Sequence, residues 1–279
     1  MKGHKKMKPT IKDLYKSYIS NNIPLLLIGK SGTGKSEIVK QIADELGLPV
    51  VDLRMSQLPP EDLNGLPAPT DDKKAFTYLL PEWFNKFQPD TPFVLFLDEI
   101  NQATPNTINA LYAIIHDRMI AGRYNPNMRV VAAGNLLDES DYLNALPQPL
   151  LNRFVVKTHE PKEKDVLDYL SGKYADNDKA LRIIKAVEKI DWLRDLNPRA
   201  LERCIKILTV CNIMDSDEIN AQCSGNMGLT QIIMDSLKTK KINTCDETST
   251  AELIKKAKTL KDSPNTDDVI NEIKELING

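Results

Sequence analysis

The chain has 279 residues, enough for one large domain or two modest ones, and its 41% hydrophobic and 27% charged content is typical of a globular protein. The net charge of −2 argues against a broadly basic, nucleic-acid-binding surface. No apolar run approaches the roughly 18 residues that span a membrane, and the four cysteines form no C-x-x-C pair, so we expect a cytoplasmic protein with reduced thiols.

Lysines cluster at the start of the chain, without the apolar stretch that would make this segment a secretory signal. We expect residues 1–10 to form a flexible, solvated basic tail, with a nucleic-acid or lipid contact as the alternative. The apolar spacing then predicts a helix over residues 11–21, with Leu14 and Tyr18 on one side and Thr10 in the N-cap position.

The first chemical landmark is Gly29-Lys30-Ser31-Gly32-Thr33-Gly34-Lys35-Ser36, which fits G-x-x-x-x-G-K-[ST] at every fixed position. The apolar run over residues 23–28 predicts a buried strand before it. Residues 37–46 are apolar at helical spacing and are followed by Gly47, which predicts a helix after it. This context disfavours the alternative of a chance match in a glycine-rich turn.

The predicted geometry indicates how this loop would hold a nucleotide. Glycines let the backbone wrap closely around a phosphate chain with its N–H groups pointing inward. The helix that starts near Gly34 adds the positive end of its dipole. We therefore expect residues 29–36 to bind phosphates, with Lys35 reaching the β- and γ-phosphates and the Ser36 hydroxyl binding Mg²⁺.

Strand candidates and a turn-rich segment follow the loop. Residues 48–53 are a strand candidate with mixed burial, and residues 59–69 carry a glycine and four prolines, which favour turns. Residues 76–80 predict a short strand that leaves this segment. An apolar helix start is predicted at residues 81–84.

The second chemical landmark is Phe-Val-Leu-Phe-Leu-Asp-Glu at residues 93–99. Five apolar residues in a row predict a central parallel strand buried on both faces. The two carboxylates that end it would lie at the carboxyl edge of the sheet, where open α/β folds bind ligands. There Asp98 would hold the Mg²⁺ shell, and Glu99 would polarise a water for attack on the γ-phosphate. The alternative is a solvated acidic turn, which the neighbouring phosphate loop makes less favourable.

Two more strands are predicted after a helix over residues 103–119. Residues 129–135 form the fourth strand, and Asn135 would hydrogen-bond the attacking water or the γ-phosphate, although asparagine after glycine is usually a turn residue. Residues 154–158 form the fifth strand, directly after Arg153. An isolated arginine there would be a surface charge, so only its place in the order of motifs favours a functional role.

The alternation of strand and helix stops after residue 160. Helices are predicted over residues 162–173, 179–193, 198–214 and 229–237, and two more over residues 251–260 and 267–277. We expect a nucleotide-binding α/β core over residues 11–160, a helical lid over residues 161–240 and a helical extension over residues 241–279.

The order of these landmarks resembles that of AAA+ ATPases. Residues 29–36, 97–99, 133–135, 151–154 and 197–199 are similar to Walker A, Walker B, sensor 1, the arginine finger and sensor 2 of that superfamily. The resemblance covers roughly residues 11–215.

Other stretches resemble the MoxR-like, dynein-related subgroup. They are Asp98-Glu99-Ile100-Asn101-Gln102-Ala103, Leu146-Pro147-Gln148-Pro149 and the segment over residues 52–65. Two positions depart from its pattern, Leu136 where several members have proline and Asn152 where aspartate precedes the finger. Neither departure removes a catalytic group.

The resemblance implies a P-loop NTPase core with a five-stranded parallel sheet and an α-helical lid, ATP and Mg²⁺ between them, and a homo-oligomeric ring, commonly a hexamer. Glu99, Asn135, Arg153 and Arg199 would be catalytic. Arg153 would complete the neighbouring subunit's site, and Arg199 would contact the same phosphate from the lid and report hydrolysis as lid rotation. For Arg199 the alternative is a first-turn helix residue after Pro198.

Three functions are compatible with these patterns. The leading one is a Mg-dependent ATPase that remodels or assembles an unidentified protein partner, as a MoxR-like chaperone does. The second is a nucleic-acid motor or loader, against which the low net charge and the lack of an aromatic-basic patch count. The third is a nucleotide-dependent scaffold with little turnover, against which Glu99, Asn135 and Arg153 count. A guanine-specific enzyme is disfavoured because no N-K-x-D sequence occurs.

Overall fold

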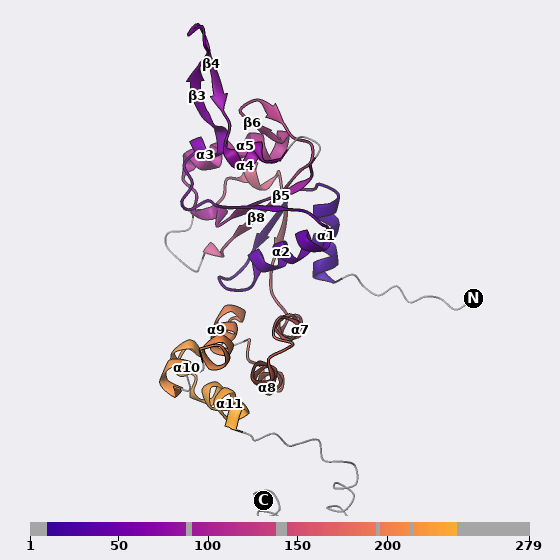
Figure 1. Ribbon diagram of the computed structural model, residues 1–279, viewed down its shortest axis with the longest axis vertical. Coiled ribbons are helices and arrows are strands. Elements are labelled where there is room, and N and C mark those ends of the chain that lie inside the picture. Colours follow the sequence, from indigo (N-terminus) through magenta and orange to yellow (C-terminus); the bar gives the residue numbers. More distant parts are fainter. Residues whose placement is uncertain (1–9, 88–90, 138–143, 194–195, 212–214, 239–279) are drawn as a thin grey trace, which may run out of the picture.

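The computed structural model describes residues 10–87, 91–137, 144–193, 196–211 and 215–238. Its centre is a five-stranded parallel sheet with the strand order β2-β5-β8-β1-β9 (Figure 1). The strands are β1 (Leu25–Ile28), β2 (Val50–Arg54), β5 (Phe93–Asp98), β8 (Met128–Gly134) and β9 (Val155–Thr158). The sheet confirms the predicted fold class and brings the ends of β1, β5 and β8 to one edge.

Strand β5 is covered by helices on both faces of the sheet. Its first five residues are fully buried. Alternate residues pack on one face with α5 (Pro105–Asp117), and the others pack on the opposite face with α1 (Ile11–Ser20) and α2 (Lys35–Glu45) (Figure 1). The continuous apolar run is therefore a doubly covered parallel strand, as predicted.

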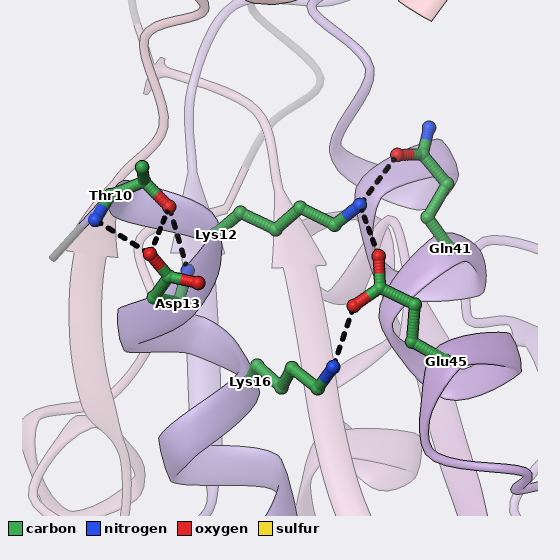
Figure 2. Close-up of polar contacts among 6 residues, drawn as sticks. All are labelled: Thr10, Lys12, Asp13, Lys16, Gln41 and Glu45. Carbon is green, nitrogen blue, oxygen red and sulfur yellow. Dashed lines mark hydrogen bonds and ion pairs between the residues drawn. The ribbon is translucent and has the colours of Figure 1, made fainter.

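Helix α1 is capped at its start and lies against α2. The side chain of Thr10 accepts a hydrogen bond from the Asp13 N–H, and the Asp13 carboxylate accepts one from the Thr10 N–H, which makes a capping box. Lys12 and Lys16 each place Nζ 2.7 Å from Glu45 of α2 (Figure 2). The two lysines lower the pKa of Glu45 to about 2. Exposed ion pairs contribute little stability, so the apolar face of α1 provides most of its attachment.

A projecting hairpin separates β2 from β5. Between α3 (Glu61–Asn64) and α4 (Glu82–Asn85), strands β3 (Leu66–Pro69) and β4 (Phe76–Leu79) pair in antiparallel fashion and extend away from the sheet (Figure 1). Residues 59–69 therefore hold a helical turn and a strand as well as turns, which corrects the turn-rich expectation. A proline-containing strand is tolerated because the hairpin has two free edges.

Short elements complete the α/β part. Helix α5 begins at Pro105 behind the N-cap Thr104 and ends where Arg118 adopts a left-handed conformation, so it is shorter than predicted. A small hairpin of β6 (Met119–Ile120) and β7 (Arg123–Tyr124), which the sequence did not indicate, follows it. The 3-10 turn η1 (Ile100–Gln102) and α6 (Gln148–Leu151) flank the functional edge and the fifth strand.

Five helices follow the sheet and share their own apolar core, which confirms the helical lid. They are α7 (Glu163–Lys173), α8 (Asp178–Val187), α9 (Pro198–Thr209), α10 (Ser216–Gln222) and α11 (Met227–Lys238). Helix α8 ends earlier than predicted because the chain turns to bury Trp192 in this core. Helix α10 was not predicted.

Several expectations fall outside the described residues. They are residues 1–9 of the basic tail, residues 212–214 and the helices over residues 251–260 and 267–277. The helix predicted over residues 198–214 already ends at Thr209, so it is shorter than predicted. Within the described ranges, no helix has the length and apolar character needed to cross a membrane.

Candidate nucleotide site

The glycine loop connects β1 to α2 as the sequence predicted. Gly32 and Gly34 adopt φ angles of 74° and 89°, in the left-handed region that glycine adopts without strain. Gly34 is the N-cap of α2 and supplies no side chain to bond the first amides of the helix. These amides and the positive end of the helix dipole are therefore suited to an anionic ligand.

Lys35 is buried at the centre of the loop. Its ammonium donates to the carbonyl oxygens of Gly29 (2.7 Å) and Lys30 (2.8 Å) and to Oδ1 of Asn135 (3.0 Å). Only 7% of the residue is exposed. The ammonium thus links the loop to the end of β8. A positive charge at this position is suited to contact a phosphate.

Ser36 and Asp98 meet across the edge of the sheet. The Ser36 hydroxyl donates to Oδ2 of Asp98 over 2.9 Å. One hydroxyl and one carboxylate are hard oxygen ligands, and Mg²⁺ in phosphate sites is bound by one or two such groups together with phosphates and waters. The pair therefore fits the predicted Mg²⁺ site. In the described part of the chain no cluster of three or more His, Cys, Asp or Glu residues offers another metal site.

Glu99 leaves strand β5 in a left-handed conformation, with φ 57° and ψ 38°. Its N–H donates to Oδ1 of Asp98 (2.9 Å), and its carboxylate accepts a hydrogen bond from the Ser56 hydroxyl (2.6 Å). Arg54 Nε lies 4.0 Å from the same carboxylate oxygen. The last residue of β2 and a residue just after it therefore orient the carboxylate predicted to be the general base.

Asn101 organises the Asn135 side of the site, a role that sequence reasoning did not assign to it. Its side-chain amide donates to the Asn135 carbonyl (2.8 Å), and its Oδ1 accepts from the Asn135 N–H (3.2 Å). It is 2% exposed. Because the backbone of Asn135 is held on both sides, its side chain is presented to Lys35. A Cβ on Gly134 would lie 3.2 Å from Asn101 Oδ1, so this position favours glycine.

The start of helix α9 packs on the glycine loop. The backbone N–H of Arg199 donates to the Gly32 carbonyl (3.3 Å). A Cβ added to Gly32 would lie 2.9 Å from Oδ1 of Asn197, the N-cap of α9. The exposed side chain of Arg199 therefore projects from backbone that contacts the loop, and its contact with phosphate stays a prediction.

Arg153 lies far from the other predicted site residues. It precedes β9, whose parallel register with β1 puts Val155 beside Leu25 and the far end of β9 beside the loop. The four residues of β9, about 13 Å at roughly 3.3 Å per residue, separate Arg153 from the end of the strand that lies beside the loop. Its guanidinium donates to the Pro149 carbonyl and stacks over the ring of a tyrosine at 4.9 Å. Arg153 therefore belongs to the opposite edge of the sheet.

His159 is a second residue that sequence reasoning missed. It continues β9 beside the loop: its N–H donates to the Ile28 carbonyl (2.7 Å), and its own carbonyl would lie 2.4 Å from a Cβ on Gly29. Its ring nitrogen Nε2 is 3.2 Å from the Thr33 carbonyl oxygen, whereas Nδ1 is buried and has no hydrogen-bond partner. Burial lowers the pKa of His159, and the nearby Lys35 charge lowers it further.

We expect acid to destabilise the fold through His159. With its folded pKa below the unfolded value of about 6.5, the unfolded state binds the proton first. The free energy of unfolding therefore falls as pH drops below about 6.5, by at most about 1.4 kcal/mol per pH unit for one proton. His159→Gln keeps a donor for the Thr33 carbonyl and should flatten this slope between pH 7 and pH 5 in thermal melts. The exposed His116→Gln is the control; equal slopes in His159→Gln and the unmodified protein would contradict the assignment.

Comparison with known proteins gives a family match over the part of the chain that holds this site. A family model described as an AAA domain of the dynein-related subfamily matches residues 24–154. Midasin from Giardia intestinalis is 28% identical over 214 residues, which are 67% of this chain and 4% of midasin. The chain thus spans a small part of the length of that relative.

Solved structures of lower similarity are also found. A RuvB variant from Thermotoga maritima matches with a TM-score of 0.47 and 17% identity, over 81% of this chain and 66% of that one. The RuvB Holliday junction branch migration motor of the same organism gives 0.44 and 18%, over 83% and 72%. The family match spans the glycine loop and the ends of β5 and β8, so residues 24–154 are similar to AAA domains of the dynein-related subfamily.

Proposed function

We propose that the protein is a Mg-dependent ATPase of the AAA+ class that couples ATP hydrolysis to remodelling or assembly of a protein partner, in the manner of a MoxR-like chaperone. The observation that carries the proposal is one bonded cluster. Lys35 bonds the glycine loop and Asn135, and Ser36 bonds Asp98, so the phosphate loop is joined to the carboxyl ends of β8 and β5.

Each residue of this cluster has a role in the proposed reaction. The amides of residues 29–36 and the Lys35 ammonium bind the β- and γ-phosphates. Glu99 takes a proton from the attacking water, and Asn135 orients that water or the γ-phosphate. Ser36 and Asp98 hold Mg²⁺, which neutralises charge on the phosphate oxygens.

The proposed partner is a protein because of the surface of the β3–β4 hairpin. Leu66, Phe76 and Leu79 are all more than half exposed. Leu66 and Leu79 pair on one face of the hairpin and Phe76 lies on the other, so both faces carry exposed apolar side chains. Such exposure on a projecting element is typical of a protein–protein contact. At the tip of the hairpin, two aspartates precede two lysines, so the hairpin carries no excess of positive charge that would favour a phosphate backbone.

The proposed assembly is a homo-oligomeric ring, such as a hexamer. In this ring Arg153 acts on the nucleotide of the next subunit. Its position before β9, with about 13 Å of strand between it and its own loop, supports this role. Arg199, at the lid's contact with Gly32, would sense the γ-phosphate within its own subunit.

Lys35→Ala tests the proposed nucleotide site. Each charge-assisted hydrogen bond contributes roughly 1.5–3 kcal/mol, so loss of the ammonium should weaken ATP binding by about 10²-fold or more. Isothermal calorimetry with ATP and Mg²⁺ measures this directly, and circular dichroism checks that the fold persists.

Lys40→Ala is the matched control for Lys35→Ala. Lys40 lies on the same helix but pairs with Asp52 at the surface (2.8 Å). ATP affinity should be unchanged in this variant. Unchanged affinity in Lys35→Ala would instead show that the glycine loop is not the phosphate site.

A further inference from the structure

One side-chain hydrogen bond joins the lid to the helix that follows the glycine loop. Tyr169 of α7 donates from its hydroxyl to Oε1 of Glu37 over 2.7 Å. Glu37 lies in the first turn of α2, directly after Ser36. Together with the contact between α9 and Gly32, this bond holds the lid on both sides of the phosphate-binding segment.

The Tyr169 hydroxyl also belongs to a charged network within the lid. It accepts a hydrogen bond from the Lys173 ammonium (3.0 Å), which pairs with Glu202 of α9 (3.0 Å). Glu202 in turn pairs with Lys206 (3.0 Å). Helices α7 and α9 are therefore linked to each other by this network. Both of these helices also contact the loop segment.

The local environment keeps this hydroxyl a donor. Burial raises the pKa of Tyr169 and Glu37 raises it further, while Lys173 lowers it. The phenol therefore stays protonated at neutral pH and Glu37 accepts. Its aromatic ring packs against the apolar core of the lid, so removal of the hydroxyl alone would leave the packing in place.

We propose that Tyr169 is a positioning residue of the ATPase site, whose hydrogen bond to Glu37 holds the lid against α2 and must break before nucleotide leaves. The proposal rests on the proposed nucleotide site. It adds a lid contact that acts through α2 and does not touch the phosphates. Release of ADP should accordingly be faster without this bond, and the rate of the chemical step with ATP bound should stay unchanged.

Tyr169→Phe tests the proposal in the full chain. The variant loses a hydrogen bond to a charged acceptor. We therefore expect it to release a fluorescent ADP analogue about tenfold faster than the unmodified protein in stopped flow. The rate of single-turnover hydrolysis at saturating ATP should match the unmodified protein. Tyr174→Phe is the matched control, because Tyr174 also packs on the lid core and donates only to Glu202, within the lid (3.4 Å).

We call the hydrogen bond between Tyr169 and Glu37 the latch. A double-mutant cycle distinguishes loss of the latch from a general loosening of the lid. Glu37→Ala removes the acceptor, so Tyr169→Phe should add nothing in that background. Equal release rates in Tyr169→Phe and the unmodified protein, additive effects in the cycle, or the same acceleration in Tyr174→Phe would each overturn the proposal.

A distance measurement tests the latch without nucleotide. Cys211, exposed at the end of α9, and Asp44→Cys on α2 accept a fluorophore pair in a Cys245→Ser background, since Cys204 and Cys223 are buried. Tyr169→Phe should broaden the distance distribution, whereas Tyr174→Phe should not. If the unmodified protein binds no ADP analogue, the proposed function fails, and this distribution still decides whether the latch exists: an unbroadened Tyr169→Phe distribution overturns it.

Discussion

Arg153→Ala is expected to bind ATP about normally and to hydrolyse it on the order of 10³–10⁵-fold more slowly, the range in which arginine fingers act. The reason is positional. Arg153 precedes β9 at the edge of the sheet opposite the glycine loop, so in the proposed ring it would neutralise charge on a neighbouring subunit's γ-phosphate. Activity per subunit of the unmodified protein should also rise with concentration as the ring assembles. A coupled ATPase assay measures both.

Mixing two inactive variants provides the sharper test of this role. Arg153→Ala has an intact glycine loop, and Lys35→Ala has an intact finger. Mixed rings contain interfaces that combine both intact parts, so part of the activity should return. Mass photometry with labelled subunits must first show that subunits exchange. No recovered activity in verified mixed rings would make Arg153 a structural residue, held by the Pro149 carbonyl and an aromatic ring as the structure shows.

Glu99→Gln is expected to lower turnover by about 10²-fold or more while ATP affinity stays normal. Glutamine keeps the size of the side chain and an oxygen that can accept from the Ser56 hydroxyl, but it cannot take a proton. Rapid-quench measurement of hydrolysis, paired with calorimetry for ATP affinity, separates the chemical step from binding.

Glu82→Gln is a suitable control for Glu99→Gln, because its carboxylate is 86% exposed and pairs only with Lys86 one helical turn away. It should hydrolyse ATP at the normal rate. Near-normal turnover in Glu99→Gln would place the general base elsewhere. The same Glu99→Gln protein should stay engaged with its partner in the ATP-bound form, so untagged proteins that copurify with it would identify that partner.

Local sequence patterns were sufficient for the parts of the site that lie within one element. The glycine loop, its strand and its helix are contiguous, and five apolar residues before Asp98 define a buried strand. Parallel strands end at one edge, so the pattern also predicted that Asp98 lies at the carboxyl edge of the sheet, where Ser36 of the loop contacts it over 2.9 Å. The predicted roles of these residues in catalysis await the measurements above.

Contacts between distant segments were not predictable in the same way. Asn101 follows the acidic pair in sequence. Its role is to hydrogen-bond the backbone of Asn135, which is 34 residues later in the chain. His159 carries no motif, and only the register of β9 against β1 brings it to the loop. The strand β3 contains two prolines, and prolines argue against predicting a strand. They are compatible with one here because both edges of the hairpin are free, which the sequence alone does not show.

The order of strands has a consequence for biosynthesis. The glycine loop emerges from the ribosome directly after β1, but β1 pairs with β8 and β9, more than a hundred residues later. Closing such long loops makes the pairing slow and entropically costly until the late strands arrive. The loop is completed only when His159 lies beside Gly29. A nascent chain that has not yet reached His159 contains the whole phosphate-binding sequence but has no complete nucleotide site. Nucleotide binding would therefore mark the end of core folding.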